Sequence, residues 1–365
     1  MKAERTIKSL KEKIDLFSKP ENNLFCYILY KEIEVTEATS AENNEDYFAD
    51  IKYEFLNTRW SLIKYSESFN EPCFYIIESH GSDISQLILR LESIAHKDSI
   101  ISLWHFDNHI AYFENFKSAI SSDINFITHN SGVPGYLTNS HSLIAEHIPA
   151  CTLQFSKTSI ITGRNANLAH ERISKALFNY VDYPNSPRAW ILEELQKEVS
   201  DVADFIIMPS SDRSRYWKKP LEERYAEWAH YKCTVIVPLV EDLSTRVFDS
   251  LATGLIPIIP KNVRDIDSAI HPEVQEQLGI VIIDDLSPEN VRTGIEKAIL
   301  NFNKMGVDGV VKRTDYVINN ALISHRVKSM TSFIDRVACD NITITYGSGP
   351  SGIGIYATTN QKDNV

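Results

Sequence analysis

The segment Val235–Pro260, which reads VIVPLVEDLSTRVFDSLATGLIPIIP, places the strongest constraint on the fold. An apolar run, Thr234–Pro238, opens it and is typical of a strand buried on both faces of a parallel sheet. The polar loop Glu241–Thr245 comes after this run. Because serine and threonine are preferred helix N-caps, the end of the loop predicts a helix that starts near Arg246.

The second half of this segment predicts the end of the helix and a second strand. Gly254 is placed to end the helix as a C-terminal glycine, and Ile256–Ile259 reads as the next strand. Strand–loop–helix–strand is the repeating unit of a parallel α/β sheet. Open sheets of this kind bind ligands beyond the carboxyl ends of their strands, where the polar loop is expected.

The length of 365 residues exceeds one ordinary hydrophobic core, so we expect two domains. In the first, residues 1–156, short apolar runs alternate with helical patterns, which indicates a parallel sheet. These runs are 24–29, 73–77, 99–104, 124–127 and 151–155.

The second domain is predicted to span residues 157–338. It is expected to open with a strand at Thr158–Arg164 that ends in Gly-Arg, followed by a helix at His170–Tyr180. Further strands are expected at 202–208, 234–238 and 280–283, with helices at 213–231, 287–303 and 313–338. The predicted fold class is α/β with two Rossmann-like domains.

Residues 339–365 contain a strand followed by Gly347-Ser-Gly-Pro-Ser-Gly352, which matches G-x-G-x-x-G. A dinucleotide site also needs a following helix and a second strand with an acidic residue, and the chain stops at Val365. We therefore expect a flexible tail or the truncated start of a further domain.

Charge and cysteine content exclude several classes of protein. A formal net charge of −12 argues against a general nucleic-acid binder. Five widely spaced cysteines, mostly in apolar runs, fit reduced buried thiols rather than a disulfide framework or a metal site. The N-terminus reads as a charged amphipathic helix without an apolar signal core, which favours a cytoplasmic protein.

The acidic residues of Val235–Pro260, which we call the organising segment, resemble a motif of a known family. Glu241 and Asp249 are separated by seven residues and precede Gly254-Leu-Ile-Pro257. This arrangement resembles the E-x7-E region of retaining, nucleotide-sugar-dependent glycosyltransferases of the two-Rossmann-domain (GT-B) architecture. The run from Ser244 to Pro257 also resembles the exostosin-type signature S-x-R-x-F-D…G-x-I-P, within a C-terminal domain like that of glycosyltransferase group 1. This chain departs from the pattern in having aspartate at the second acidic position, where many relatives have glutamate.

The resemblance implies a central cleft between the two domains and specific roles for its motif residues. Asp249 would accept hydrogen bonds from the ribose hydroxyls, and Glu241 would act at the donor sugar. Ser244, Thr245 and Arg246 would bind the leaving phosphates, since a cation in a first helical turn needs an anionic partner. For Arg246 that partner is a phosphate or Glu241.

A second set of cations is expected to help bind the phosphates. Gly163-Arg164 resembles the Gly-Arg pair at the start of the nucleotide-binding domain in related transferases, which implies that Arg164 binds the nucleotide sugar. The further cation candidates are Arg172, Lys175, Arg213 and Arg215. Taken alone, each of these residues is more often a solvated surface charge.

Two histidine-containing segments of the first domain come after predicted strands. His105 and Asp107 are expected to be catalytic, because a histidine near a carboxylate can deprotonate an acceptor hydroxyl. His109, His129 and Asn130 are expected to bind the acceptor. Structural capping is the alternative for these segments. No metal and no cofactor beyond the nucleotide-sugar substrate are predicted, since no fourth metal ligand is apparent.

The sequence therefore predicts a glycosyltransferase that moves a sugar from a nucleotide-activated donor to a glycan or lipid-linked acceptor. Retention and a role in surface polysaccharide synthesis are implied by the resemblance. Expected partners are the nucleotide sugar and the acceptor, with contact at the inner membrane face or with other glycan-synthesis enzymes. The alternatives are a nucleotide-sugar epimerase and a non-catalytic two-domain α/β sugar-binding protein.

Overall fold

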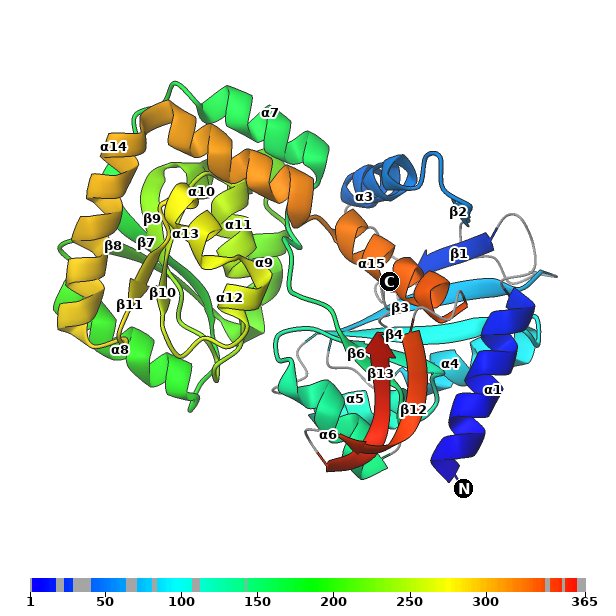
Figure 1. The fold of residues 1–365 in the computed structure, drawn as a ribbon. Helices are drawn as coiled ribbons and strands as arrows, with labels where there is room; N and C mark the ends of the chain where they lie inside the picture. The colour runs from blue at the N-terminus through cyan, green and yellow to red at the C-terminus, as the bar shows by residue number, and fades with distance from the viewer. Residues whose placement is uncertain are drawn as a thin grey trace, which may run out of the picture. The chain divides into compact units, whose positions relative to one another are not determined.

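A computed structural model describes residues 2–17, 23–28, 41–63, 71–80, 84–106, 112–141, 143–338, 342–349 and 352–359. The chain divides into two compact units (Figure 1). Unit 1 comprises the described residues within 1–38, 48–149 and 324–365, and unit 2 those within 39–47 and 150–323. The chain thus leaves unit 1 near residue 150 and returns to it near residue 323.

Unit 1 is built on a sheet of six parallel strands in the order β2-β1-β3-β4-β5-β6. Every residue of the central strand β4 is buried, because helices cover both faces of such a sheet. The strands are β1 (Asn23–Ile28), β2 (Trp60–Leu62), β3 (Cys73–His80), β4 (Ile100–Phe106), β5 (Ile124–Ile127) and β6 (Ala145–His147). The helices in or entering this unit are α1 (Lys2–Phe17), α3 (Ala41–Glu54), α4 (Ser85–Ile94), α5 (Tyr112–Ala119), α6 (Gly132–His141) and α15 (Ile323–Ala338).

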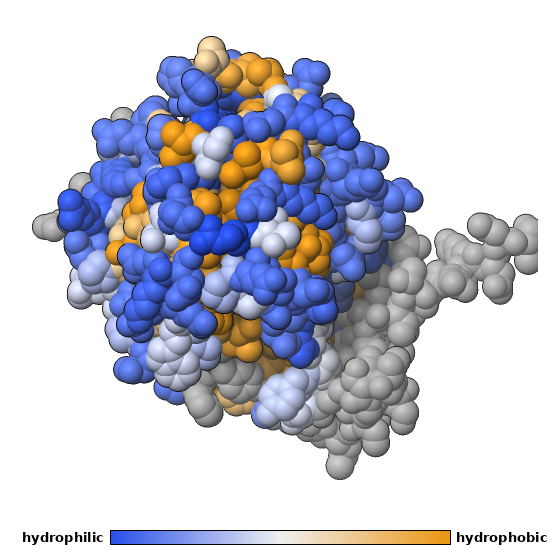
Figure 2. Space-filling model, turned by 90° about the vertical axis from the view of Figure 1, so that its left-hand side faces the viewer, coloured by the Kyte–Doolittle hydropathy of each residue, from blue (hydrophilic) through white to orange (hydrophobic). Residues whose placement is uncertain are grey.

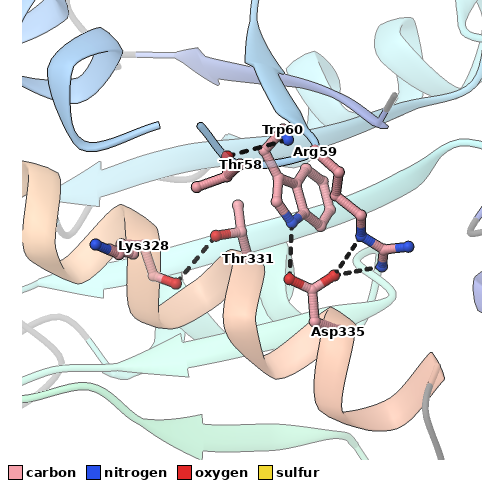
Figure 3. A network of polar contacts seen from close by, with 6 residues as sticks. All are labelled: Thr58, Arg59, Trp60, Lys328, Thr331 and Asp335. Atoms are coloured by element: carbon pink, nitrogen blue, oxygen red, sulfur yellow. Dashed lines mark hydrogen bonds and ion pairs between the residues drawn. The ribbon is translucent and has the colours of Figure 1, made fainter. Parts of the chain in front are cut away.

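The last helix, α15, is fixed within unit 1 by a polar network (Figure 3). The Asp335 carboxylate accepts hydrogen bonds from Trp60 Nε1 and from Arg59 Nε, each at 2.9 Å. Two distant segments are thereby joined around one half-exposed carboxylate. The C-terminal helix therefore belongs to unit 1, although residues up to 338 were expected in the second domain.

The glycine-rich tail forms an antiparallel pair, β12 (Ile342–Gly349) with β13 (Gly352–Thr359). Gly349 pairs with Gly352, so the G-x-G-x-x-G match lies across a hairpin. Among the described residues, no helix comes after this hairpin.

Unit 2 contains five parallel strands in the order β11-β10-β9-β7-β8. They are β7 (Ile173–Asp182), β8 (Ala203–Pro209), β9 (Tyr231–Val235), β10 (Ile256–Pro260) and β11 (Val281–Ile283). The helices are α7 (Lys157–Asn167), α8 (Pro187–Val199), α9 (Arg213–Trp217), α10 (Leu221–Ala229), α11 (Arg246–Ala252), α12 (Ile266–Ala269), α13 (Pro272–Leu278) and α14 (Pro288–Asn320), with a 3₁₀ turn at Ser210–Asp212.

Helices cover both faces of this second sheet, as the alternation of buried side chains shows. Val235 and Ile258 belong to a core cluster with residues of α8 and the first half of α14. Their neighbours Ile236 and Ile259 belong to another cluster with residues of α7, α10 and α11. This is a doubly wound arrangement. The prediction of two Rossmann-like α/β domains is therefore confirmed.

The side of the molecule on which α8 and α14 lie in Figure 1 is shown in space-filling form in Figure 2. Hydrophobic residues occur there in separate spots among hydrophilic ones. This pattern is expected for the solvent side of helices that cover a buried sheet.

The organising segment has the predicted strand–helix–strand order, but its first strand ends at Val235 and not at Pro238, and its N-cap differs. It runs from β9 through α11 to β10, and Gly254 ends the helix with φ +79°. Thr245 occupies the N-cap position but makes no side-chain capping bond, because its backbone is already helical. Ser244 Oγ instead accepts from Arg246 N at 3.4 Å.

The start of the second domain was predicted wrongly. Residues 158–164 lie in helix α7, and residues 173–182 form strand β7, the reverse of the expected order. Ser156 caps α7 by accepting from Ser159 N at 3.1 Å, and Gly163 packs against the ring of Tyr225. Ile160 and Ile161, which suggested a strand, lie in one turn of an amphipathic helix in which Ile160 is buried. Residues 151–155 are also not a strand.

Candidate anion site at the carboxyl edge of the unit 2 sheet

The strand order of unit 2 reverses direction between β7 and β9. From β7 the chain goes outward to β8 and then returns to the other side of β7, where β9, β10 and β11 are added in turn. Neighbouring crossover connections therefore leave the sheet in opposite directions at the carboxyl ends of β7 and β9. Open α/β sheets bind ligands at such a switch point.

Tyr180, near the end of β7, joins the two strands at this point. Its hydroxyl donates to Val235 O and accepts from Val237 N, each at 2.7 Å. The ring is fully buried, and burial raises the pKa of the phenol, so the hydroxyl stays protonated and keeps its donor role. The buried Tyr180 ring, held by these two hydrogen bonds, is the surface on which neighbouring side chains pack.

Two guanidinium groups pack against the ring of Tyr180. Arg188, from the first turn of α8, lies with Cζ at 5.4 Å from the ring centroid and at 4.9 Å from that of Tyr183. Arg246, from the first turn of α11, lies with Cζ at 4.5 Å from the Tyr180 centroid. The connections after β7 and β9 therefore each place one cation at the switch point.

Arg188 is an unusual buried charge. Its side chain is 6% exposed and its Nε is enclosed without a hydrogen-bond partner. Within the described part of the chain the guanidinium makes no hydrogen bond and no ion pair. Burial, and then the nearby charge of Arg246, lower the pKa of Arg188 to about 10. The group is still charged at neutral pH.

Arg246 and Asp242 complete the cluster. Arg246 Nε donates to Asn179 O at 3.0 Å. Asp242 Oδ1 accepts from Leu239 N at 2.7 Å and from Val240 N at 3.1 Å, which shapes the loop after β9. Its charge also acts on Arg188. Two cations next to one carboxylate leave net positive charge, which suits an anion with several oxygens.

The two acidic residues of the organising segment are not brought together. Glu241 lies half-exposed on the loop after β9 and accepts from Arg264 Nε at 2.9 Å. Asp249 is 2% exposed and accepts from Thr152 Oγ1 at 2.6 Å and from Gln154 Nε2 at 2.9 Å. Burial raises the pKa of Asp249. Its role on a ribose stays a prediction, and in this structure the carboxylate holds the segment that enters unit 2.

The predicted second set of cations lies elsewhere. The strand–Gly–Arg arrangement expected around Arg164 is wrong, because Arg164 is on helix α7 and bonds to Asp315 at 2.6 Å and to Thr314 Oγ1 at 2.9 Å. Arg172 is buried and donates to the carbonyls of Tyr231 and Thr253. Lys175 pairs with Asp204 on the sheet surface. The side chain of Arg213 is not among the described groups, and Arg215 is exposed.

In unit 1 the predicted catalytic and acceptor residues are only partly visible. Asp107 and His109 lie outside the described residues. His105 is buried within β4, with Nε2 at 2.7 Å from Asn125 Oδ1, so it lies in the strand and not in the loop beyond it. His129 is buried with φ +69°, and Asn130 Oδ1 accepts from Gly132 N at 2.9 Å. Their catalytic and acceptor roles stay predictions.

Sequence reasoning missed Arg188, Tyr180 and Asp242. The signal for Arg188 was the run Asn185-Ser-Pro-Arg188, in which a serine cap and a first-turn proline announce a helix. It was overlooked because the strand before it was read as a helix. Once β7 is recognised, Arg188 lies just beyond the carboxyl end of a central strand.

No group of three or more His, Cys, Asp or Glu side chains in the described part of the chain is arranged to hold a metal ion. None of the described helices has both the length and the apolar character needed to cross a membrane.

No protein-family model matches the chain, and no curated protein matches it. Among solved structures it is similar to sucrose-phosphate synthase from Thermosynechococcus elongatus, with 9% identity over 87% of this chain and 100% of that one (TM-score 0.49). It is also similar to the UDP-forming α,α-trehalose-phosphate synthase from Burkholderia vietnamiensis, with 9% identity over 82% and 76% (TM-score 0.48).

A third similar structure is that of a GtfA/B complex, with 12% identity over 73% of this chain (TM-score 0.40). The chain spans 58% of the length of that protein.

Proposed function

We propose that the chain is a glycosyltransferase whose unit 2 binds a nucleotide-sugar donor at the β7–β9 switch point. The observation that carries the proposal is the pair of guanidinium groups on Tyr180, one from the buried Arg188 and one from the half-buried Arg246. A buried guanidinium without a hydrogen bond is costly, so its place at the ligand edge of the sheet favours an anionic ligand. The diphosphate of an activated sugar offers the several oxygens that two guanidinium groups can share.

The resemblance of the organising segment to nucleotide-sugar-dependent transferases supports the same ligand class. Arg246 belongs to that segment and packs on Tyr180 beside Arg188. The segment therefore contributes a side chain to the anion cluster, and the sequence pattern and the charge cluster point to one site.

In the proposed mechanism Arg188 and Arg246 neutralise the diphosphate as its bond to the sugar breaks. Glu241 lies on the loop after β9 at the same edge, and its ion pair with Arg264 is half-exposed. Such surface pairs are worth about 0–1 kcal/mol, so exchanging Arg264 for sugar hydroxyls costs little. We assign Glu241 to the donor sugar. Retention of configuration, a glycan or lipid-linked acceptor, and polysaccharide synthesis are parts of the same proposal.

A thermal-shift screen of the full chain against UDP, GDP, CMP and ADP tests the donor site. A nucleotide at 100 times its Kd should stabilise the protein by about 2.7 kcal/mol. The shift should disappear in Arg188→Met and persist in Arg172→Met, whose guanidinium is equally buried but donates to carbonyls. Failure of all four nucleotides to stabilise the protein would overturn the proposal.

Turnover then distinguishes transfer from isomerisation. With the nucleotide sugar that binds best, a transferase releases nucleotide when acceptor is present, apart from slow hydrolysis. Conversion of the free nucleotide sugar into its epimer, without nucleotide release, would identify an epimerase in place of a transferase.

A further inference from the structure

A second buried arginine of unit 2 lacks hydrogen-bond partners. Arg224, in the first turn of α10, is 2% exposed, and its Nε and Nη1 are enclosed without a partner. No hydrogen bond or ion pair of this side chain is found in the part of the chain that the structure describes. Buried charges in proteins are normally paired, so this group needs an explanation.

Other buried arginines of the same unit show what a structural role looks like. Arg172 donates to the carbonyls of Tyr231 and Thr253, and Arg313 donates to those of Gly254 and Leu278. Both therefore hold the ends of secondary-structure elements. Arg224 does nothing comparable, and Glu227, the acid one turn along α10, is already bonded to Asn179 and Lys219.

Two aromatic rings pack against Arg224. Its Cζ lies 5.1 Å from the ring centroid of Trp217 and 5.8 Å from that of Tyr216, both on α9. Trp217 is 45% exposed, and its neighbours Arg215 and Lys218 are exposed too. Helices α9 and α10 come after β8, the strand beside β7, so they begin at the same edge of the sheet as the Arg188 cluster.

We propose that Arg224 and Trp217 form a second binding site, for a sugar that carries a phosphate group. The guanidinium would take the phosphate oxygens, and the exposed indole face would take the sugar ring. This deepens the proposed function and rests on it, because the ligand would be a phosphorylated acceptor of the transfer reaction. The chemistry is distinct from that of the donor site, where two guanidinium groups pack on the fully buried ring of Tyr180.

Tryptophan fluorescence of the full chain, titrated with galactose 6-phosphate, galactose and inorganic phosphate, tests this site. The phosphorylated sugar should change the emission at concentrations at least tenfold lower than either of the other two probes. Arg224→Met should weaken that response at least tenfold. Trp217→Phe should abolish the emission change, while competition calorimetry still detects binding.

Two control variants separate this proposal from the donor site. Arg188→Met should leave the sugar-phosphate response intact, and Arg224→Met should leave the nucleotide thermal shift intact. Arg224→Lys, which keeps the charge, should retain part of the binding if Arg224→Met proves misfolded by circular dichroism. Equal affinity for inorganic phosphate and galactose 6-phosphate, or an unchanged response in Arg224→Met, would overturn the inference. Absence of the nucleotide shift in wild-type protein would refute only the donor-site proposal.

Discussion

Replacing Arg188 with methionine should make the ligand-free protein more stable, although it removes the central side chain of the proposed site. Lowering the pKa of Arg188 from 12.5 to about 10 corresponds to roughly 3 kcal/mol against the charged form at neutral pH. Cation–π attraction to Tyr180 and Tyr183 offsets about 1–2 kcal/mol of this burial penalty. Methionine keeps much of the apolar packing without the charge. We expect a net gain of about 1–2 kcal/mol, the difference between these two terms.

Arg172→Met is the matched control for this prediction. Burial lowers the pKa of Arg172 to about 10 as well, but its nitrogens donate to Tyr231 O and Thr253 O. Methionine leaves both carbonyls without these donors, at about 1–3 kcal/mol each. Arg172→Met should therefore be less stable than Arg188→Met by about 2–6 kcal/mol, the sum for those two bonds.

Thermal and urea unfolding of the two variants and the wild type, monitored by circular dichroism, measure the difference. The gain in Arg188→Met should raise the Tm of the unit 2 transition by roughly 2–8 °C. It should be constant between about pH 5 and pH 8. A folded-state pKa of about 10 keeps the penalty fully present below that pH, and the penalty is relieved only as the pH rises through it. Destabilisation of Arg188→Met to the level of Arg172→Met would refute the reasoning.

The organising segment and its acidic residues allow three more tests. Gly254→Ala should destabilise the protein by about 1–3 kcal/mol in urea unfolding, because φ is +79° and a Cβ would lie 2.6 Å from Val310 Cγ1. Gly306→Ala, also at positive φ but with open space around it, should destabilise the protein less. Equal destabilisation by the two substitutions would contradict the steric explanation. Asp249→Asn should flatten a fall in stability that begins near about pH 4, the ordinary pKa range of an aspartate. The raised folded pKa means that the native carboxyl binds protons more tightly than the unfolded one, so wild-type stability falls as the pH rises from that range through the folded pKa. An unchanged Tm–pH profile would refute it. Glu241→Ala should change stability by less than about 1 kcal/mol, since the ion pair of Glu241 with Arg264 is half-exposed. The variant should still bind the nucleotide but release it more slowly from the sugar donor during transfer. A loss of nucleotide affinity would place Glu241 elsewhere in the site.

The architecture was predictable where apolar runs were long and bounded. In the β9–α11–β10 segment the short helix and β10 have the predicted positions, with Gly254 between them, whereas β9 lies three residues before the predicted strand. The strand alternation of unit 1 was visible for the same reason. In these places local sequence is sufficient to predict the element, because the hydrophobic pattern and the residues that bound it indicate the same type of secondary structure.

The error at the start of unit 2 shows the limit of such patterns. Residues 158–164 carry an isoleucine pair next to serine and threonine residues, which favours a strand by intrinsic preference. The helix forms because the Ser156 cap and the close approach of Gly163 to Tyr225, a residue of α10, favour it together. That second contact is tertiary, and a single sequence does not reveal it.

The candidate site was predictable only in part. Arg246 was identified from its motif and does lie in the cation cluster. Arg188 was not found, since its importance comes from the strand order that places β7 beside β9. The burial of Asp249 by Thr152 and Gln154 depends on a segment about a hundred residues earlier in the chain. The charged residues of a site can be found in the local sequence, but the residues that they contact lie far away in the chain and depend on the fold.

Calorimetric titration of nucleoside diphosphate and monophosphate tests the central claim most directly. The wild type should bind the diphosphate of the preferred base at least tenfold more tightly than the monophosphate. Arg188→Met and Arg246→Met should each remove most of that preference while leaving monophosphate affinity within about threefold, since each guanidinium–phosphate bond is worth about 1.5–3 kcal/mol. A diphosphate preference that survives in both variants would contradict the assignment of the phosphates to the β7–β9 switch point.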